Sequence, residues 1–134
     1  MKNISLLLAS IFIFPTTTIG DEIDYSKISE ASSARIEKIL VRYTRLLGEP
    51  CANIQILTPG DWQVIETERM CSFNGLSFET DFADAYFSDP KFSSDGVHLH
   101  LSLTPLEPTG EQKKKCFIPI KNKHIGTIEC IASD

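Results

Sequence analysis

The chain has 134 residues, 13 of them basic and 18 acidic, so its net charge at neutral pH is −5. Affinity for nucleic acid depends on lysine and arginine neutralising phosphate, so this acidic balance disfavours a nucleic-acid partner. It permits a cationic protein partner, although acidity also serves solubility alone. The length fits one domain.

The first 20 residues have the three-part pattern of a secretory signal peptide. Lys2 gives a short positive start, residues 4–14 form an apolar run, and residues 15–20 are a small, polar exit. The run is too short to cross a bilayer, which needs about 20 apolar residues. We therefore expect cleavage after Gly20, a single domain over residues 21–134 with no membrane span, and a periplasmic or secreted location. A retained N-terminal anchor is the alternative interpretation.

Residues 21–48 carry apolar side chains at steps of three and four. Ile36, Leu40, Tyr43 and Leu47 belong to this stripe, which is the pattern of one face of a helix. Gly48 is a natural stop for a helix, and Pro50 prevents its continuation. This pattern predicts an N-terminal helix.

From Cys51 onward the apolar pattern alternates, which predicts strands. We expect strands over residues 53–57, 62–73 and 97–103, and a hairpin centred on Asn74 and Gly75, a pair that strongly favours a two-residue turn. Residues 88–96 and 104–112 are expected to be polar loops. A second hairpin is expected over residues 113–120 and 125–131, with Pro119 at an edge or a bulge. The predicted fold class is α+β: one N-terminal helix packed on a curved antiparallel sheet of about five or six strands.

The chain has four cysteines, and an even number in an exported protein predicts two disulfides. A hairpin turn centred on Lys123 would place Cys116 opposite Cys130, and Cys51–Cys71 then follows by elimination. Two other pairings stay formally open. The spacings contain no C-x-x-C, which disfavours a zinc ribbon or a thioredoxin-type redox pair.

Two histidines, His98 and His100, alternate with Val97, Leu99 and Leu101 in the expected strand over 97–103. Alternation places both imidazoles on the face opposite the apolar residues, which we expect to face solvent. A metal site would need at least a third ligand, and nothing in the sequence fixes one nearby. We therefore expect no metal and no cofactor.

Catalytic motifs are weak in this chain. No G-x-S-x-G elbow is present, and paired cysteines leave no thiol nucleophile. Glu79 and Asp81 are expected on the same wet face of a strand, where they could serve as a carboxylate pair. The sequence accordingly predicts a protein that is not an enzyme; a small secreted hydrolase using paired carboxylates or a histidine-bound metal is the alternative.

The favoured function is a binding protein, a periplasmic inhibitor or immunity protein that neutralises a cationic enzyme or toxin through an acidic loop bearing aromatic residues. Size and plan are similar to those of periplasmic lysozyme inhibitors and toxin-immunity proteins, without a family motif. An envelope or secretion-system accessory module is a further alternative, and pairing of the exposed strand over 97–103 could form a homodimer. The expected partner-binding residues are Trp62, Asp84, Tyr86, Asp89, Phe92 and Asp95.

Overall fold

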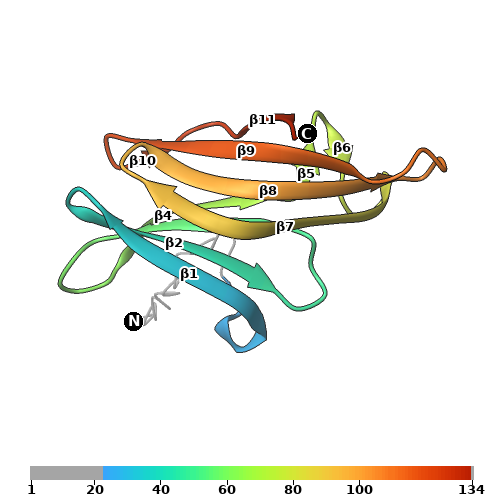
Figure 1. Cartoon of the computed structure of the whole chain (residues 1–134). Coiled ribbons are helices and arrows are strands. Elements are labelled where there is room, and N and C mark those ends of the chain that lie inside the picture. Colours follow the sequence, from blue (N-terminus) through green and yellow to red (C-terminus); the bar gives the residue numbers. More distant parts are fainter. Residues whose placement is uncertain (1–22, 134) are drawn as a thin grey trace, which may run out of the picture.

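The computed structural model describes residues 23–133, and within them the chain forms two antiparallel sheets that pack face to face (Figure 1). The expected signal peptide over residues 1–20 lies outside the described residues. The first sheet has four strands in chain order, and a short 3-10 turn precedes it. These elements are η1 (Tyr25–Lys27), β1 (Ile28–Ile36), β2 (Ile39–Leu46), β3 (Ala52–Leu57) and β4 (Val64–Met70).

The second sheet is also a meander, in which β9 has neighbours along both edges. Its order is β10-β9-β8-β7, and β11 pairs with β9 beyond β10. A small hairpin, β5–β6, lies in the connection between the two sheets. The elements are β5 (Ser72–Phe73), β6 (Leu76–Ser77), β7 (Phe82–Ser93), β8 (Gly96–Pro105), β9 (Gln112–Lys121), β10 (His124–Ile125) and β11 (Glu129–Ala132).

The expected N-terminal helix is wrong, because β1 and β2 form a hairpin in its place. Ile36 pairs with Ile39 and Ser32 with Tyr43, and the buried Ile39, Val41 and Tyr43 alternate with half-buried residues along β2. The turn residues are Glu37 and Lys38, and Glu37 has a φ of 54°. Glycine or asparagine normally takes this left-handed position in a hairpin turn, so the sequence carried no turn signal here. The protein is therefore a two-sheet β structure and not an α+β fold.

The core lies between the two sheets. The first sheet contributes Val41, Tyr43, Ile54 and Ile56, and the second contributes a larger set of buried side chains: Phe87, Val97, Leu99, Leu101, Leu103 and Ile118. These side chains form one continuous cluster, as alternating strands with one buried face require.

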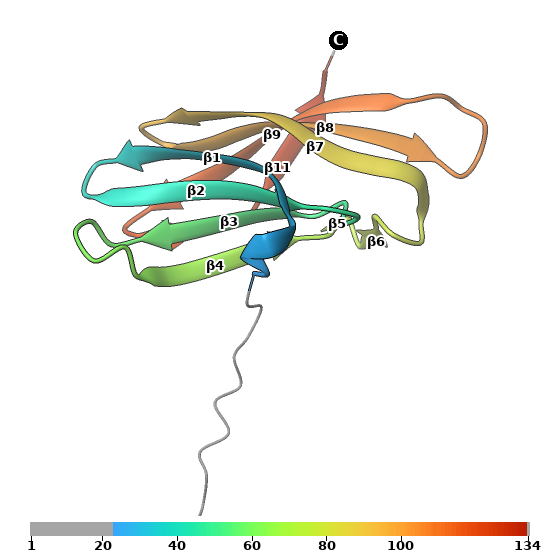
Figure 2. The ribbon, with the colours of Figure 1, turned by 90° about the horizontal axis from the view of Figure 1, so that it is seen from below.

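The outer face of the first sheet is partly covered by the segment that precedes β1. Figure 2 shows this segment crossing in front of the strands of the first sheet. The Tyr25 ring lies 5.2 Å from the Arg42 guanidinium, which also donates a 3.0 Å hydrogen bond to the Tyr25 hydroxyl. Arg42 in turn donates to the Gln55 side-chain oxygen at 2.6 Å, so η1 is tied to both β2 and β3.

The Asn74–Gly75 hairpin is confirmed, with Phe73 opposite Leu76. The strand expected over 62–73 is divided, however, because β4 ends at Met70 and β5 belongs to a separate two-stranded sheet. Phe78 is buried in the core whereas Leu76 is 46% exposed.

The polar loop expected over 88–96 is wrong for most of its length. The strand β7 continues to Ser93, and the turn to β8 is only Ser94 and Asp95. The register shifts between Ser88 and Lys91, which marks a bulge around Asp89 and Pro90. Proline is tolerated here because β7 is the edge of its sheet and needs no hydrogen-bond donor on its free side.

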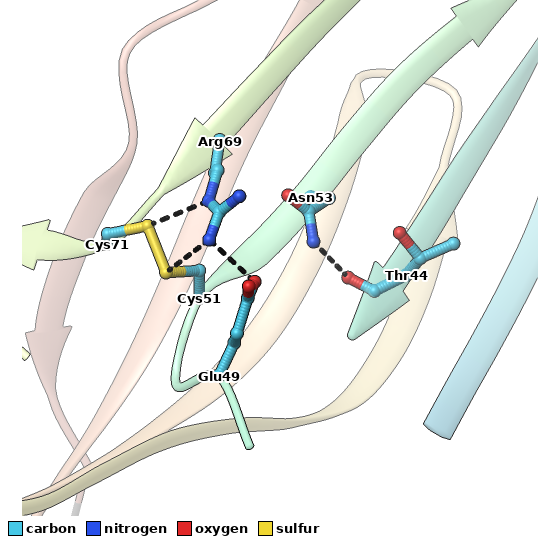
Figure 3. Close-up of polar contacts among 6 residues, drawn as sticks. All are labelled: Thr44, Glu49, Cys51, Asn53, Arg69 and Cys71. Atoms are coloured by element: carbon cyan, nitrogen blue, oxygen red, sulfur yellow. Dashed lines mark hydrogen bonds and ion pairs between the residues drawn. A yellow bond between two sulfur atoms is a disulfide. The ribbon is translucent and has the colours of Figure 1, made fainter. Parts of the chain in front are cut away.

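Both expected disulfides are confirmed. Cys116 pairs with Cys130 across neighbouring residues of β9 and β11, and Cys51 pairs with Cys71. Figure 3 shows the Arg69 guanidinium beside the Cys51–Cys71 bridge, where it donates to Cys71 Sγ at 3.3 Å and to the Glu49 carboxylate at 2.6 Å. Two disulfides are compatible with an oxidising extracellular or periplasmic environment.

Pro119 lies in an interior strand, where the pairing of β9 with β10 and β11 is interrupted, so the expected edge position is wrong and the expected bulge stays a prediction. β10 pairs with β9 at Ile120, and β11 resumes pairing at Phe117. Pro119 falls between these two stretches, where its carbonyl accepts a hydrogen bond from the Gly126 amide. The missing N–H of proline therefore interrupts no ladder bond on this side.

Candidate functional site

The connection between the two sheets closes one end of the molecule. Residues 71–81 run from β4 to β7 and carry the β5–β6 hairpin, which lies at the end opposite β10 (Figure 1). Phe78 is buried at this end of the core, and its ring lies 5.6 Å from that of Phe87 and edge-on to it. Phe82, at the start of β7, lies 6.2 Å from Phe78 and is only half-buried.

Two hollows share Phe82 as a wall. The first, of about 530 Å³, lies between the β5–β6 hairpin and the loop from β8 to β9. The second, of about 550 Å³, lies between the loop from β2 to β3 and the start of β7. We call the residues that line these two hollows the Phe82 surface.

Large apolar side chains are exposed around the Phe82 surface. Leu76 and Leu106 flank the first hollow, with exposed fractions of 46% and 68%. Leu47 and Tyr86 line the second and are also exposed. A soluble domain rarely gathers several such side chains around hollows unless they contact something else.

The charge of the Phe82 surface is predominantly negative. Five carboxylates line the hollows: Asp81 and Glu107 the first, and Glu49, Glu79 and Asp84 the second. Of the residues that the structure describes, only two cationic side chains line the hollows, and both have partners. Lys114 lies 5.3 Å from the Phe73 ring, and Arg45 pairs with Glu30 at 3.6 Å and donates to the Phe87 carbonyl at 3.1 Å.

Four of these carboxylates are free of cations. Among the ion pairs of residues 23–133, Glu49 is paired with Arg69, whereas Glu79, Asp81, Asp84 and Glu107 have no cationic side chain within 4.0 Å. Asp81 instead accepts a 2.6 Å hydrogen bond from the Ser77 amide, which holds the turn before β7. The surface therefore combines apolar anchors with uncompensated negative charge.

Two of the six expected partner-binding residues, Asp84 and Tyr86, belong to this surface. Both lie on β7 and line the second hollow. The Tyr86 hydroxyl donates to Glu111 at 3.5 Å, and the Ser102 hydroxyl donates to the same carboxylate. Glu111 therefore adds a further negative side chain next to Tyr86.

The other four expected residues lie elsewhere. Asp89 is in the β7 bulge, near Lys91 and His100, each at 3.8 Å. Phe92 packs against the core, and Asp95 is in the turn at the far end of β7. Trp62 is 52% exposed but lies in the turn between β3 and β4, outside both hollows. The acidic and aromatic residues expected in one loop therefore lie along β7 and in the turn that follows it.

His98 and His100 lie on the exposed face of β8, while Val97, Leu99, Leu101 and Leu103 are buried, as the alternation predicts. The His98 ring lies 4.8 Å from Phe117, and its Nε2 is 3.1 Å from the Ser93 hydroxyl. Within residues 23–133 there is no cluster of three or more side chains suited to a metal ion.

The expected carboxylate pair does not lie on one strand face. Glu79 and Asp81 are in the turn between β6 and β7, and each lines a different hollow. This position gives them a role in the charge of the Phe82 surface and does not bring them to one shared pocket.

Sequence reasoning missed Leu47, Leu76, Leu106 and Glu107. The apolar stripe that predicts a helix implies a buried position for Leu47, whereas Leu47 is exposed in the structure. Leu106 carried a usable signal, because it is a large apolar residue within the polar, proline-containing segment over 104–112.

Comparisons with protein-family models, with curated proteins and with solved structures each found no match. In the part of the chain that the structure describes, no helix is both long and apolar enough to cross a membrane.

Proposed function

We propose that the protein is an exported, non-enzymatic binding protein, an inhibitor or immunity protein, that docks a cationic protein partner on the Phe82 surface. The observation that carries the proposal is the coincidence of exposed Leu76, Leu106 and Tyr86 with four carboxylates that have no cationic partner among residues 23–133, around two hollows.

The apolar side chains would supply most of the affinity. Protein interfaces have a well-packed centre of a few large side chains, and tyrosine is among the residues most enriched there. Leu76 and Leu106 stand on either side of a hollow that a partner side chain could fill. Burial of this apolar area is the main favourable contribution to such association.

The carboxylates would select the partner by its charge. A negative patch attracts a positive one during diffusional encounter and raises the association rate, whereas an acidic partner is repelled. Removal of the positive Lys2 with the signal peptide would make the exported chain more acidic still. A cationic cell-wall-degrading enzyme or a cationic toxin meets both requirements.

The test is a binding experiment with the exported chain, residues 21–134, in its oxidised form. The protein is immobilised and exposed to an envelope extract and, separately, to a purified cationic muramidase whose lysis of cell walls is recorded. We compare it with a Leu76→Glu/Leu106→Glu variant and an Asp84→Lys/Glu107→Lys variant. Asp89→Lys/Asp95→Lys is the matched charge control, because it reverses two carboxylates outside the Phe82 surface.

We expect a basic protein to be retained or inhibited by the wild type, with at least tenfold weaker binding in both surface variants and little change in the control. Thermal unfolding should be nearly unchanged in the two surface variants, because the substituted side chains are exposed. Equal loss of binding in the control, or full binding by both surface variants, would contradict the proposal.

A further inference from the structure

The end of the sandwich opposite the Phe82 surface has a groove of its own. Three two-residue turns meet there: Glu37–Lys38 between β1 and β2, Ser94–Asp95 between β7 and β8, and Asn122–Lys123 between β9 and β10. The turns surround a volume of about 1320 Å³, larger than either hollow of the Phe82 surface. Figure 1 shows this end on the side where β10 is labelled.

The floor of the groove is apolar and belongs to the edge of the core. Ile36, Ile39 and Ile120 form it, with exposed fractions between 5% and 8%. Phe117 and Pro119 are half-buried and extend the apolar lining along β9. An apolar chain lying on this floor would be removed from water along its length.

The rim of the groove is charged, with lysines in excess. Lys38, Lys121 and Lys123 are exposed, and the acidic side chains of the rim are Glu37 and Asp95. None of the ion pairs among residues 23–133 involves any of these five side chains. The rim therefore has more basic than acidic side chains, although the whole chain has more acidic than basic residues.

The rim is held in place by the backbone. The Ile120 amide donates a 2.9 Å hydrogen bond to the Asp95 carbonyl, which joins β9 to the turn between β7 and β8. Beside it, Gly96 approaches β9 so closely that a Cβ atom would lie 2.1 Å from the Ile118 carbonyl oxygen. A groove with such a fixed wall is largely formed before a ligand arrives, which reduces the ordering cost of binding.

We infer that this lysine-rimmed groove binds a single-chain anionic amphiphile, with its hydrocarbon chain along the isoleucine floor and its carboxylate or phosphate head among Lys38, Lys121 and Lys123. A bare anion would leave the half-buried Phe117 and Pro119 side chains in contact with water. A neutral amphiphile would leave the excess positive charge of the rim, three lysines against Glu37 and Asp95, without a counter-charge. Only a ligand with both properties uses both parts of the groove.

The test is calorimetric titration of the oxidised chain over residues 21–134 with octanoate, decanoate, dodecanoate and dodecyl phosphate. Inorganic phosphate, acetate and dodecyl maltoside are the comparison ligands. Amide resonances of residues 94–96 and 120–123 report where the ligand sits. Lys121→Glu/Lys123→Glu tests the rim, and Lys113→Glu/Lys115→Glu is the matched control, because it makes the same two charge reversals at exposed positions of β9 outside the groove.

We expect the affinity to rise with chain length, by up to about fourfold for each added methylene. The Lys121→Glu/Lys123→Glu variant should bind dodecanoate about tenfold more weakly or worse, and the control should bind nearly as wild type. The tighter of dodecanoate and dodecyl phosphate identifies the head group. The inference is overturned if dodecanoate does not bind, if dodecyl maltoside or inorganic phosphate binds as tightly, or if the rim variant and its control behave alike.

Discussion

Tyr43 is the largest fully buried side chain, and its hydroxyl has no hydrogen-bond partner in the described structure. A buried hydroxyl without a partner destabilises the folded state by about 1–3 kcal/mol, because it leaves water and gains no replacement bond. Tyr43→Phe removes this oxygen and keeps the ring in the core. We expect the variant to be more stable than the wild type by about 1 kcal/mol at neutral pH, after allowance for the small void that remains.

The difference should grow in alkaline solution. Burial raises the pKa of Tyr43 from 10.0 to about 12, with a smaller contribution from the nearby Glu30 carboxylate. Between these two values the unfolded chain loses the phenolic proton while the folded protein keeps it, so the unfolded state is favoured as the pH rises. A shift of two pKa units corresponds to about 3 kcal/mol of stability, present below pH 10 and lost progressively towards pH 12.

The assay is urea unfolding, followed by far-ultraviolet circular dichroism, at several pH values from 7 to 12. Wild type and Tyr43→Phe are compared at each pH, so that the titration of lysines and other groups common to both proteins cancels. Tyr86→Phe is the matched control at neutral pH, because Tyr86 is 38% exposed and its hydroxyl has a hydrogen-bond acceptor, Glu111. A Tyr43→Phe variant less stable than the wild type at pH 7, or a difference that stays constant up to pH 12, would refute this reasoning.

Four other changes have expected outcomes that unfolding measurements can check. Thr44→Val should stabilise the protein by about 1 kcal/mol, because the Thr44 hydroxyl is also buried without a partner in the described residues; a loss of stability would indicate a bond that this residue does make. Phe78→Ala should destabilise the protein by about 3–5 kcal/mol, because it leaves a cavity between Phe82 and Phe87. A loss below about 1 kcal/mol would contradict the close packing of the Phe78 ring. Gly96→Ala should destabilise by about 3 kcal/mol, because its Cβ would overlap the Ile118 carbonyl, and a wild-type melting temperature would show that β8 and β9 can separate freely there. Replacing Cys116 and Cys130 together by serine should destabilise the protein by about 3 kcal/mol. The free energy of unfolding of this variant should lie between those of the oxidised and the reduced wild type, and a value equal to that of the oxidised wild type would contradict this expectation.

Much of the second half of the chain could be predicted from its sequence. The Asn74–Gly75 turn, the alternation around His98 and His100, and the Cys116–Cys130 register all rest on local rules that the structure follows. Each of these features is specified by a turn residue or by a period-two pattern within a few positions, so long-range packing had little to add.

The first hairpin shows where such rules fail. Ile39, Val41 and Tyr43 alternate as strand residues do, yet the wider spacing of Ile36, Leu40 and Leu47 also fits a helix. Only a turn signal could have separated the two interpretations, and the turn uses Glu37 in a conformation that glutamate seldom adopts. Burial against the second sheet overrides the helical preference of this segment. The sequence of the segment alone does not indicate that burial.

Only part of the candidate site could be predicted from the sequence, for a related reason. Asp84 and Tyr86 stand out by residue type, but the Phe82 surface depends on three loops that the chain brings together from residues 47–50, 73–82 and 105–107. The polar composition of residues 88–96 predicts one loop that holds Asp89 and Asp95, whereas the edge strand β7 continues to Ser93 and tolerates Pro90.

Neither disulfide joins one sheet to the other. Cys51–Cys71 closes within the half that forms β1 to β4, and Cys116–Cys130 closes within the half that forms β7 to β11. A single proteolytic cut at the exposed Asn74–Gly75 turn would therefore release two fragments with no covalent link, each keeping its own bridge. The halves could be produced separately, oxidised separately and mixed, so that recovery of the native spectrum would measure the strength of sheet-to-sheet contact without any contribution from the chain connecting them.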